Sequence, residues 1–325
     1  MTTAVMARLG EVTNRTLVLP IVLFAPTHRC NSGCLSCNWW STMPATASPG
    51  SELSLDEIDA LAADLARLGT RLVVFTGGEP LLRPDVFDAA RAFTSRGITT
   101  HLLTSGLGLE PRAEAVADAF ARVIVSLDGA TATQYREIRG VDGFAAVARG
   151  VDRLRAIAPQ VPVSARATIH ARNFRDLSGI TEAARAIGCE SVSFLAADVT
   201  SPAFGHRDLA ALNTLQLSPD EVTEFATRLE DFLQAHARDI ASHFVTESPT
   251  KLRQLAQHYA ALNGDAAFPA RACNAPWVSS VIEPNGDVRP CFFHPVVGNV
   301  RRTPVADIAR GALPAFRRDL DVATN

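Results

Sequence analysis

Three cysteines lie close together near the start of the chain. Cys30, Cys34 and Cys37 have the spacing C-x3-C-x2-C and directly follow an apolar run rich in β-branched residues. Three thiolates on one tight loop can hold three irons of a four-iron cluster and leave the fourth iron open. Zinc would need a fourth ligand, and His28 is too close to Cys30 to be an obvious one. The spacing therefore favours a [4Fe–4S] cluster, with a zinc site or a purely structural cluster as alternatives.

The remaining cysteines divide into a pair and a single residue. Cys273 and Cys291 are placed around Gly286 in the pattern C-x12-G-x4-C. Asn285-Gly286 predicts a type I′ hairpin turn, which would bring the two thiols together. The alternative is two hairpin cysteines that bind no metal. Cys189 stands alone before an expected strand and is interpreted as a core thiol, with a hydrogen-atom donor as its functional alternative.

The segments that must position these cysteines alternate between β-branched runs and helical patterns. The expected strands cover residues 17–24, 71–76, 99–104, 122–126, 163–168 and 191–194, followed by a hairpin at 278–282 and 288–292. The expected helices cover residues 55–68, 113–120, 144–157 and 176–187, with one more beginning near Pro84. Repeated strand–helix units imply a parallel sheet with right-handed crossovers, and six of them suit a partial (β/α)6 barrel in an α/β fold.

The pattern changes after the sixth expected strand. Residues 196–217 are expected to form a long loop, and a capping box at Ser218 begins a helix that ends near His236. Residues 249–262 are also expected to be helical. The expected organisation has four parts: an N-terminal extension (1–16), the barrel (17–217), a helical linker (218–272) and a small C-terminal hairpin-plus-helix domain (273–325).

A glycine-rich segment follows the second expected strand. Thr76-Gly77-Gly78-Glu79-Pro80 contains two glycines, which let the backbone approach a ligand closely. Together with the cysteine loop, it resembles the cysteine motif and the GGEP segment of the radical S-adenosylmethionine (radical SAM) superfamily, over residues 17 to about 195. The resemblance implies a [4Fe–4S] cluster that reductively cleaves S-adenosylmethionine and starts radical chemistry on a substrate.

The resemblance also implies a cosubstrate pocket at the carboxyl ends of the strands. Residues 125–129 are similar to the family's SLDG segment, and Arg139 suits planar, bidentate recognition of a carboxylate. The residues expected to bind S-adenosylmethionine are Gly77, Gly78, Glu79, Pro80, Ser105, Ser126, Asp128 and Arg139. The family usually has an aromatic residue where this chain has Ser36, so Trp39 or Trp40 is the expected substitute near the adenine.

The second cysteine pair is similar to the opening half of the SPASM or twitch extension of some radical SAM enzymes. This similarity implies an auxiliary Fe–S cluster with Cys273 and Cys291 among its ligands. The family normally supplies a further C-x2-C pair after this point, whereas no cysteine follows Cys291 up to Asn325. Two expectations therefore remain open. The auxiliary cluster is incomplete or absent, or its remaining ligands lie beyond Asn325. His294 is an alternative ligand.

Composition narrows the range of partners. The 325 residues carry 31 basic and 34 acidic side chains, and this net charge of −3 argues against nucleic acid or an anionic membrane as the main partner. The longest apolar run, residues 17–25, is interrupted by Pro20 and is shorter than the roughly 20 residues of a membrane helix. No signal peptide is apparent, so the expected location is cytoplasmic. The resemblance to radical SAM enzymes implies a one-electron reductant, flavodoxin or ferredoxin.

The expected substrate is a small molecule, such as a sugar, aminocyclitol or nucleoside, that is dehydrogenated or epimerised. This expectation rests on the short stretch before Cys30, which leaves no room for an N-terminal peptide-recognition domain. The alternatives are cross-linking or epimerisation of a ribosomally synthesised peptide and, more remotely, a non-catalytic Fe–S electron carrier. Cys189, Asp198 and His206 are the candidate catalytic residues. The 196–217 loop and the C-terminal domain are expected to close the cavity.

Overall fold

A nine-stranded sheet runs through the chain and carries the residues of interest. The computed structural model describes residues 6, 13–42, 50–206, 208–269 and 273–320. The strand order is β6-β5-β4-β3-β2-β1-β7-β8-β9. The strands are β1 (Ile21–Phe24), β2 (Leu72–Phe75), β3 (Thr99–Thr104), β4 (Arg122–Ser126), β5 (Val163–Ile169), β6 (Ser191–Ala196), β7 (Ser279–Ile282), β8 (Asp287–Arg289) and β9 (Gly298–Asn299).

The first six strands form a parallel barrel that does not close. β1 pairs with β2, and each later strand pairs in parallel with the next as far as β6. The other edge of β1 pairs with β7, with Ile21 opposite Ser279, rather than with β6. This arrangement confirms the expected partial (β/α)6 barrel. The bounds of β3 and β4 match the expected strands residue for residue.

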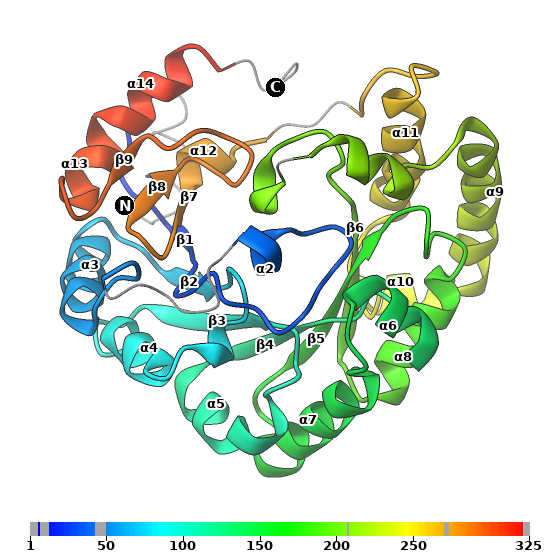
Figure 1. The fold of residues 1–325 in the computed structure, drawn as a ribbon, viewed down its shortest axis with the longest axis horizontal. Coiled ribbons are helices and arrows are strands. Elements are labelled where there is room, and N and C mark those ends of the chain that lie inside the picture. Colours follow the sequence, from blue (N-terminus) through cyan, green and yellow to red (C-terminus); the bar gives the residue numbers. More distant parts are fainter. Residues whose placement is uncertain (1–5, 7–12, 43–49, 207, 270–272, 321–325) are drawn as a thin grey trace.

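Helices cover the outer face of the curved sheet (Figure 1). They are α3 (Leu55–Arg67), α4 (Val86–Thr94), α5 (Ala113–Ala119), α7 (Phe144–Ile157) and α8 (Leu177–Ala186). The expected capping box fixes the start of α3: Ser54 Oγ accepts from the Glu57 N–H, and the Glu57 carboxylate accepts from the Ser54 N–H. None of the helices in the described part of the chain is long and apolar enough to cross a bilayer.

The segment after β6 leaves the strand–helix pattern. The expected loop at 196–217 contains two short 3-10 helices, η3 (Ala203–Gly205) and η4 (Ala210–Leu215). The helices that follow are α9 (Pro219–Ala235), α10 (Ala237–Ala241) and α11 (Pro249–Leu262). The expected capping box at Ser218 begins α9. α9 and α11 pack together at the β6 end of the sheet (Figure 1).

The C-terminal hairpin continues the barrel sheet. β7 pairs in parallel with β1 and antiparallel with β8, and β9 adds to the edge of β8. α12 (Ala275–Val278) precedes β7, whereas α13 (Val305–Arg310) and α14 (Ala312–Arg318) follow β9. The C-terminal part therefore shares backbone hydrogen bonds with the barrel strand that leads into the cysteine loop.

The hairpin turn differs from the expected type I′ turn. A type I′ turn needs positive φ at both central positions, but Gly286 has φ +89° and Asn285 is not among the residues with positive φ. The Gly286 N–H donates to the Glu283 carbonyl at 2.9 Å, so Pro284 and Asn285 are the central residues. The ring of Pro284 fixes a negative φ at the first central position. β8 also ends at Arg289, earlier than expected.

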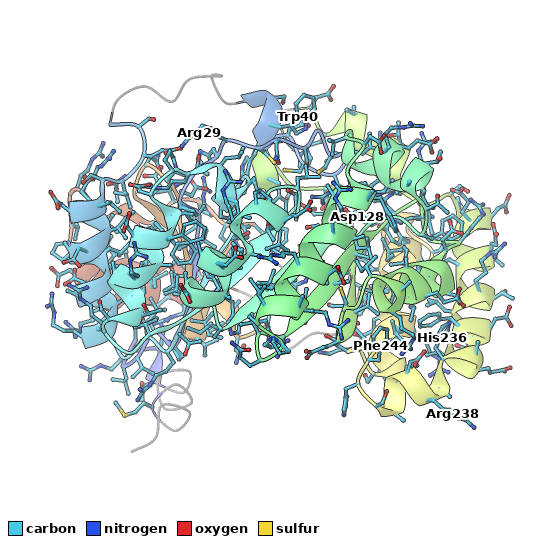
Figure 2. The ribbon with its side chains drawn as sticks, turned by 90° about the horizontal axis from the view of Figure 1, so that it is seen from below. Arg29, Trp40, Asp128, His236, Arg238 and Phe244 are labelled. Carbon is cyan, nitrogen blue, oxygen red and sulfur yellow. The ribbon has the colours of Figure 1, made fainter. Side chains whose placement is uncertain are left out.

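The two ends of the barrel are distinct in the view of Figure 2. Arg29 and Trp40 lie at one end of the molecule, and His236, Arg238 and Phe244 lie at the opposite end. Because Arg29 follows β1, the first of these is the carboxyl end of the parallel strands. Parallel barrels place their chemistry at that end.

A buried hydroxyl connects α11 to the sheet, and its removal should destabilise the fold. Tyr259 Oη donates to the Ile169 carbonyl at 2.6 Å and accepts from the Ala197 N–H at 3.1 Å, in a fully buried position. Tyr259→Phe leaves both backbone groups without this partner. The two groups keep a hydrogen bond to each other at 3.0 Å, so we expect the free energy of unfolding to fall by about 0.5–1.5 kcal/mol, measured by urea unfolding followed by circular dichroism.

Tyr135 provides the matched control. It is also fully buried, but its hydroxyl has no hydrogen-bond partner among the described residues. Tyr135→Phe should leave the free energy of unfolding unchanged or raise it slightly, because no hydrogen bond is lost. An equal loss in both variants would contradict the role assigned to the Tyr259 hydroxyl.

Candidate active site

A cavity of about 280 Å³ lies at the carboxyl ends of the parallel strands. All three cysteines of the N-terminal loop line it. The strand ends contribute Thr76, Gly77, Gly78, Thr104, Ser105, Ser126 and Thr168. An apolar wall is formed by Trp39, Trp40, Leu195, Phe204, Phe292 and Phe293. The structure thus brings the expected cluster loop and the expected cosubstrate segments to one cavity.

Backbone contacts hold the cysteine loop against the glycine-rich segment after β2. The Gly78 N–H donates to the Thr27 carbonyl at 3.0 Å, and the Glu79 N–H donates to the Arg29 carbonyl at 2.8 Å. A Cβ on Gly78 would lie 2.2 Å from the Arg29 carbonyl oxygen, so a larger residue would force the two loops apart. Gly78 therefore serves the packing of one loop on another, a role not expected from the sequence.

A second backbone contact comes from α6 (Ala132–Arg139), a helix that was not expected from the sequence. Gly140 ends this helix with φ +66°, and a Cβ there would lie 2.5 Å from the Gly33 carbonyl oxygen. The Leu35 N–H donates to the Ile138 carbonyl at 3.0 Å. The cysteine loop is therefore held from two sides.

The three thiols share one electrostatic environment. Burial raises the pKa of Cys34 to about 12 and that of Cys37 to about 11, and it also raises the pKa of Cys30. The Arg139 guanidinium lowers the pKa of all three thiols, but by less than burial raises it. Without a metal the thiols are protonated at neutral pH, so iron binding must displace their protons.

The residues around the thiols fit an anionic iron–sulfur cluster. Three thiols line one cavity, and as ligands they would leave one iron without a protein ligand, as an open [4Fe–4S] cluster requires. Ser32 Oγ and Arg139 Nε are buried without a hydrogen-bond partner among the described residues. Unpaired buried donors of this kind are suited to an anionic group beside them.

The expected cosubstrate residues separate into two groups. Those that line the cavity are Gly77, Gly78, Ser105, Ser126 and Arg139, and those that do not are Glu79, Pro80 and Asp128. The Glu79 carboxylate is buried and occupied by protein donors. It accepts from the Leu81 N–H at 3.1 Å, the Thr104 hydroxyl at 2.7 Å and the Ser105 N–H at 2.6 Å. Glu79 therefore connects the ends of β2 and β3.

Asp128 and Arg139 form a buried ion pair at the cavity wall. Arg139 Nη1 lies 2.9 Å from Asp128 Oδ2, and the two side chains are 12% and 5% exposed. Asp128 Oδ1 also accepts from the Thr168 N–H at 2.7 Å. Because Asp128 is itself anchored to β5, it holds the guanidinium in place at the cavity.

The two tryptophans near the third cysteine have different surroundings. Ser36 lines the cavity beside both of them. Trp40 Nε1 donates to the carbonyl of the third cysteine at 2.8 Å, and the side chain stays exposed. Trp39 is buried, with its ring centroid 5.9 Å from that of Phe204 and 5.7 Å from that of Phe292. Trp39 belongs to an aromatic cluster, whereas Trp40 keeps open surface at the cavity.

The segment between β6 and α9 packs on the cysteine loop. The Phe204 carbonyl accepts from the Asn38 N–H at 2.9 Å, and His206 Nε2 lies 3.2 Å from the Ser36 carbonyl oxygen. Phe204 adopts a φ of +57°, which is strained for an aromatic residue. This segment therefore forms part of the cavity wall, and its strained residue lies at the point of contact.

The three candidate catalytic residues have different surroundings. Asp198 lines the cavity, but its carboxylate accepts from Thr200 and Ser201 in its own turn. His206 is buried, and its Nδ1 has no partner among the described residues. Cys189 lies in the hydrophobic core, where burial raises its pKa to about 12, and it does not line the cavity.

The second cysteine pair lies at the start and the end of the hairpin. Cys273 is exposed and Cys291 is half-buried. Burial raises the pKa of the Cys291 thiol, and the nearby Cys273 raises it further. Phe292 and Phe293, which follow directly, line the cavity. The His294 N–H donates to the Cys291 carbonyl at 3.3 Å, and its ring packs on an aromatic side chain of α14. Cys291 is thus adjacent in sequence to two residues of the cavity wall, Phe292 and Phe293.

Comparison with known proteins agrees with this geometry. Residues 24–169 match the model of the radical SAM superfamily, and residues 273–323 match SPASM, an iron–sulfur cluster-binding domain. A PqqA peptide cyclase of Ruegeria pomeroyi is 30% identical over 293 residues, which cover 87% of this chain and 70% of that protein. The chain belongs to the radical SAM superfamily. Its cofactors are accordingly a [4Fe–4S] cluster and S-adenosylmethionine, and the SPASM domain implies auxiliary Fe–S clusters.

Two further similarities extend over most of this radical SAM enzyme. An AdoMet-dependent heme synthase of Methanosarcina barkeri is 29% identical over 311 residues, which cover 92% of this chain and 84% of that protein. The crystal structure of Streptococcus suis SuiB bound to precursor peptide SuiA has a TM-score of 0.70 at 16% identity, covering 96% of this chain and 70% of that chain. The structural similarity concerns the fold and confirms the barrel with its C-terminal extension.

Removal of the Arg139 guanidinium should weaken cosubstrate binding. If Arg139 binds the cosubstrate's carboxylate as expected, Arg139→Ala should reduce the affinity for S-adenosylmethionine by about 1.5–3 kcal/mol, because charged hydrogen bonds would be lost. Calorimetric titration of the anaerobically reconstituted protein measures the change, with the affinity expressed per cluster because Arg139 also acts on the thiols. Arg136→Ala is the control, since Arg136 is exposed on the same helix. Wild-type affinity in Arg139→Ala would remove this residue from the site.

The C-terminal cysteines should hold iron that is independent of the first loop. The triple variant with Cys30, Cys34 and Cys37 changed to Ala should retain iron, and further change of Cys273 and Cys291 to Ser should remove it, since thiolates are the ligands of such clusters. Iron and sulfide analysis measures both. Cys189→Ala is the control and should leave the iron content unchanged, because that thiol lies in the core. An iron-free triple variant would contradict an auxiliary cluster.

Proposed function

We propose that this radical SAM enzyme modifies a ribosomally synthesised peptide, with Cys30, Cys34 and Cys37 as the ligands of its [4Fe–4S] cluster. The observation that carries the proposal is the single cavity lined by all three thiols and by five of the expected cosubstrate residues, Gly77, Gly78, Ser105, Ser126 and Arg139. When bound, the cluster and S-adenosylmethionine supply a one-electron cleavage whose radical product abstracts a hydrogen atom from the substrate. Flavodoxin or ferredoxin is the proposed electron donor.

The chain's own residues bind and orient the cosubstrate and shield the reactive species from water. Arg139, held by Asp128, presents its guanidinium to the carboxylate of the cosubstrate. Ser105 and Ser126 offer hydroxyl groups on the same wall. The aromatic cluster around Trp39 excludes water from the side of the C-terminal hairpin, which protects a reactive species from side reactions. Positioning of this kind is the protein's main contribution to radical chemistry.

Apolar side chains at the cavity favour a peptide as the substrate. Trp40, Leu195 and Phe293 line the cavity and are 46%, 43% and 55% exposed. Exposed apolar groups gathered at one site mark an interaction surface, and a peptide would cover them with its own side chains. The PqqA peptide cyclase among the relatives supports the same substrate class.

The small-molecule substrate expected from the sequence is not confirmed. It stays a second candidate because of the similarity to an AdoMet-dependent heme synthase, which extends over 84% of that protein. Under either candidate, Cys273 and Cys291 are the proposed ligands of an auxiliary cluster, and an acceptor of this kind would suit net oxidation of the substrate.

Substrate-dependent cleavage of S-adenosylmethionine distinguishes the candidates. With dithionite as reductant, wild-type protein should form 5′-deoxyadenosine faster when a peptide encoded beside its gene is added, and the mass of that peptide should change. The triple variant of Cys30, Cys34 and Cys37 is the control and should form none, because it lacks the cluster's thiolates. Stimulation by iron porphyrin precursors alone would favour the second candidate. Unchanged cleavage in the triple variant would end the radical SAM assignment of this cavity.

A further inference from the structure

A guanidinium lies beside the cavity on the inner face of the barrel. Arg166 on β5 is the register partner of Ser126 on β4, which lines the cavity. Thr168, two residues further along β5, also lines the cavity. Register partners on neighbouring parallel strands share a face, as do residues i and i+2 of one strand. Arg166 is therefore on the cavity face of the sheet, next to the proposed cosubstrate wall.

This guanidinium makes no hydrogen bond to any of the described residues. Arg166 is partly buried, and its Nε is fully buried without a hydrogen bond. Burial lowers the pKa of Arg166, which shows that the charged form is held at a cost in this environment. A buried guanidinium nitrogen without a hydrogen bond is unfavourable, and an acceptor such as a carboxylate oxygen would satisfy it.

The nearby carboxylates are engaged elsewhere. Glu247 acts on Arg166 electrostatically, but its oxygens accept from the Ser193 hydroxyl at 2.9 Å and the Phe194 N–H at 3.1 Å. Asp128 is paired with Arg139. Arg166 therefore differs from Arg139. Arg139 lines the cavity and is hydrogen-bonded to a carboxylate, whereas Arg166 lies on the same inner face below the lining residue Thr168 and makes no hydrogen bond to a carboxylate of the described residues.

We propose that Arg166 binds a carboxylate of the substrate, beside the cosubstrate site. The inference rests on the proposed function and narrows its substrate class to a peptide that presents an acidic side chain or a C-terminal carboxylate in the cavity. A guanidinium suits this task because its donors match the planar geometry of a carboxylate. Its position next to Ser126 would fix the distance between the bound carboxylate and the cosubstrate.

A pair of matched probes tests the binding of a carboxylate. N-acetyl-glutamate N-methylamide should raise the thermal midpoint of the anaerobically reconstituted full chain by about 2 °C at roughly ten times its dissociation constant. N-acetyl-glutamine N-methylamide has the same shape without the charge and should have no effect. Arg166→Gln should abolish the shift, whereas Arg172→Gln, an equal change of charge at an exposed position after β5, should preserve it. An equal shift in Arg166→Gln, or with the neutral probe, would overturn the proposal.

Two further measurements separate this role from a cosubstrate or a structural role. Arg166→Gln should bind S-adenosylmethionine within about twofold of the wild type, and a loss of about tenfold or more would assign Arg166 to the cosubstrate instead. Its thermal midpoint without a probe should equal or exceed that of the wild type, because an unpaired buried charge is removed. A clear fall in that midpoint would show a structural role and also overturn the proposal. None of these readouts requires turnover, so their failure leaves the proposed radical function standing.

Discussion

The geometry of this site depends on how closely three pieces of backbone approach one another. The cysteine loop touches the segment after β2 at Gly78 and the end of α6 at Gly140, where a Cβ would lie 2.2 Å and 2.5 Å from carbonyl oxygens of the loop. Neither contact involves a sulfur atom. The packing of its backbone therefore shapes the loop and brings the three thiols together. A residue with a Cβ in place of Gly78 or Gly140 would push the neighbouring backbone away.

Charged side chains surround the cysteine loop, and each is held by a defined contact or left without one. Burial holds the pKa values of the three thiols high, and Arg139 supplies a positive charge that acts on all of them. Arg139 is in turn fixed by Asp128, which β5 anchors through the Thr168 N–H. One inner face of the barrel thus carries a cation already paired and, at Arg166, a cation still unpaired. The paired Arg139 is suited to bind the cosubstrate, which is the same in every reaction cycle. The unpaired Arg166 is suited to recognise a carboxylate of the substrate.

Much of the barrel and the grouping of the site were predictable, because strand periodicity and strand-end motifs are local properties of the sequence. α6 was missed because only Tyr135 and Ile138 on it are buried, although Thr131 with Gln134 fits the capping pattern at its start and Gly140 marks its end. The prediction of a type I′ turn at Asn285-Gly286 was wrong because Pro284 fixes a negative φ at the first central position of the turn. The aromatic cluster joins Phe204 to Phe292, with ring centroids 5.3 Å apart, and no local pattern connects residues so distant in sequence. Similarly, the motif predicted that Glu79 binds the cosubstrate, whereas its carboxylate is buried and accepts hydrogen bonds from protein groups. That burial follows from tertiary packing, which the motif does not reveal.

The pairing of β1 with both β2 and β7 has a consequence for how the chain is made. β1 meets β2 soon after synthesis begins, but its other edge receives no partner until the segment around Ser279 has left the ribosome. Until then an apolar strand presents unpaired backbone groups, which is a known route to aggregation. Slow translation or premature termination before the hairpin would expose that edge for longer. A nascent chain that has not yet reached Ser279 should therefore be more prone to aggregation than the finished protein.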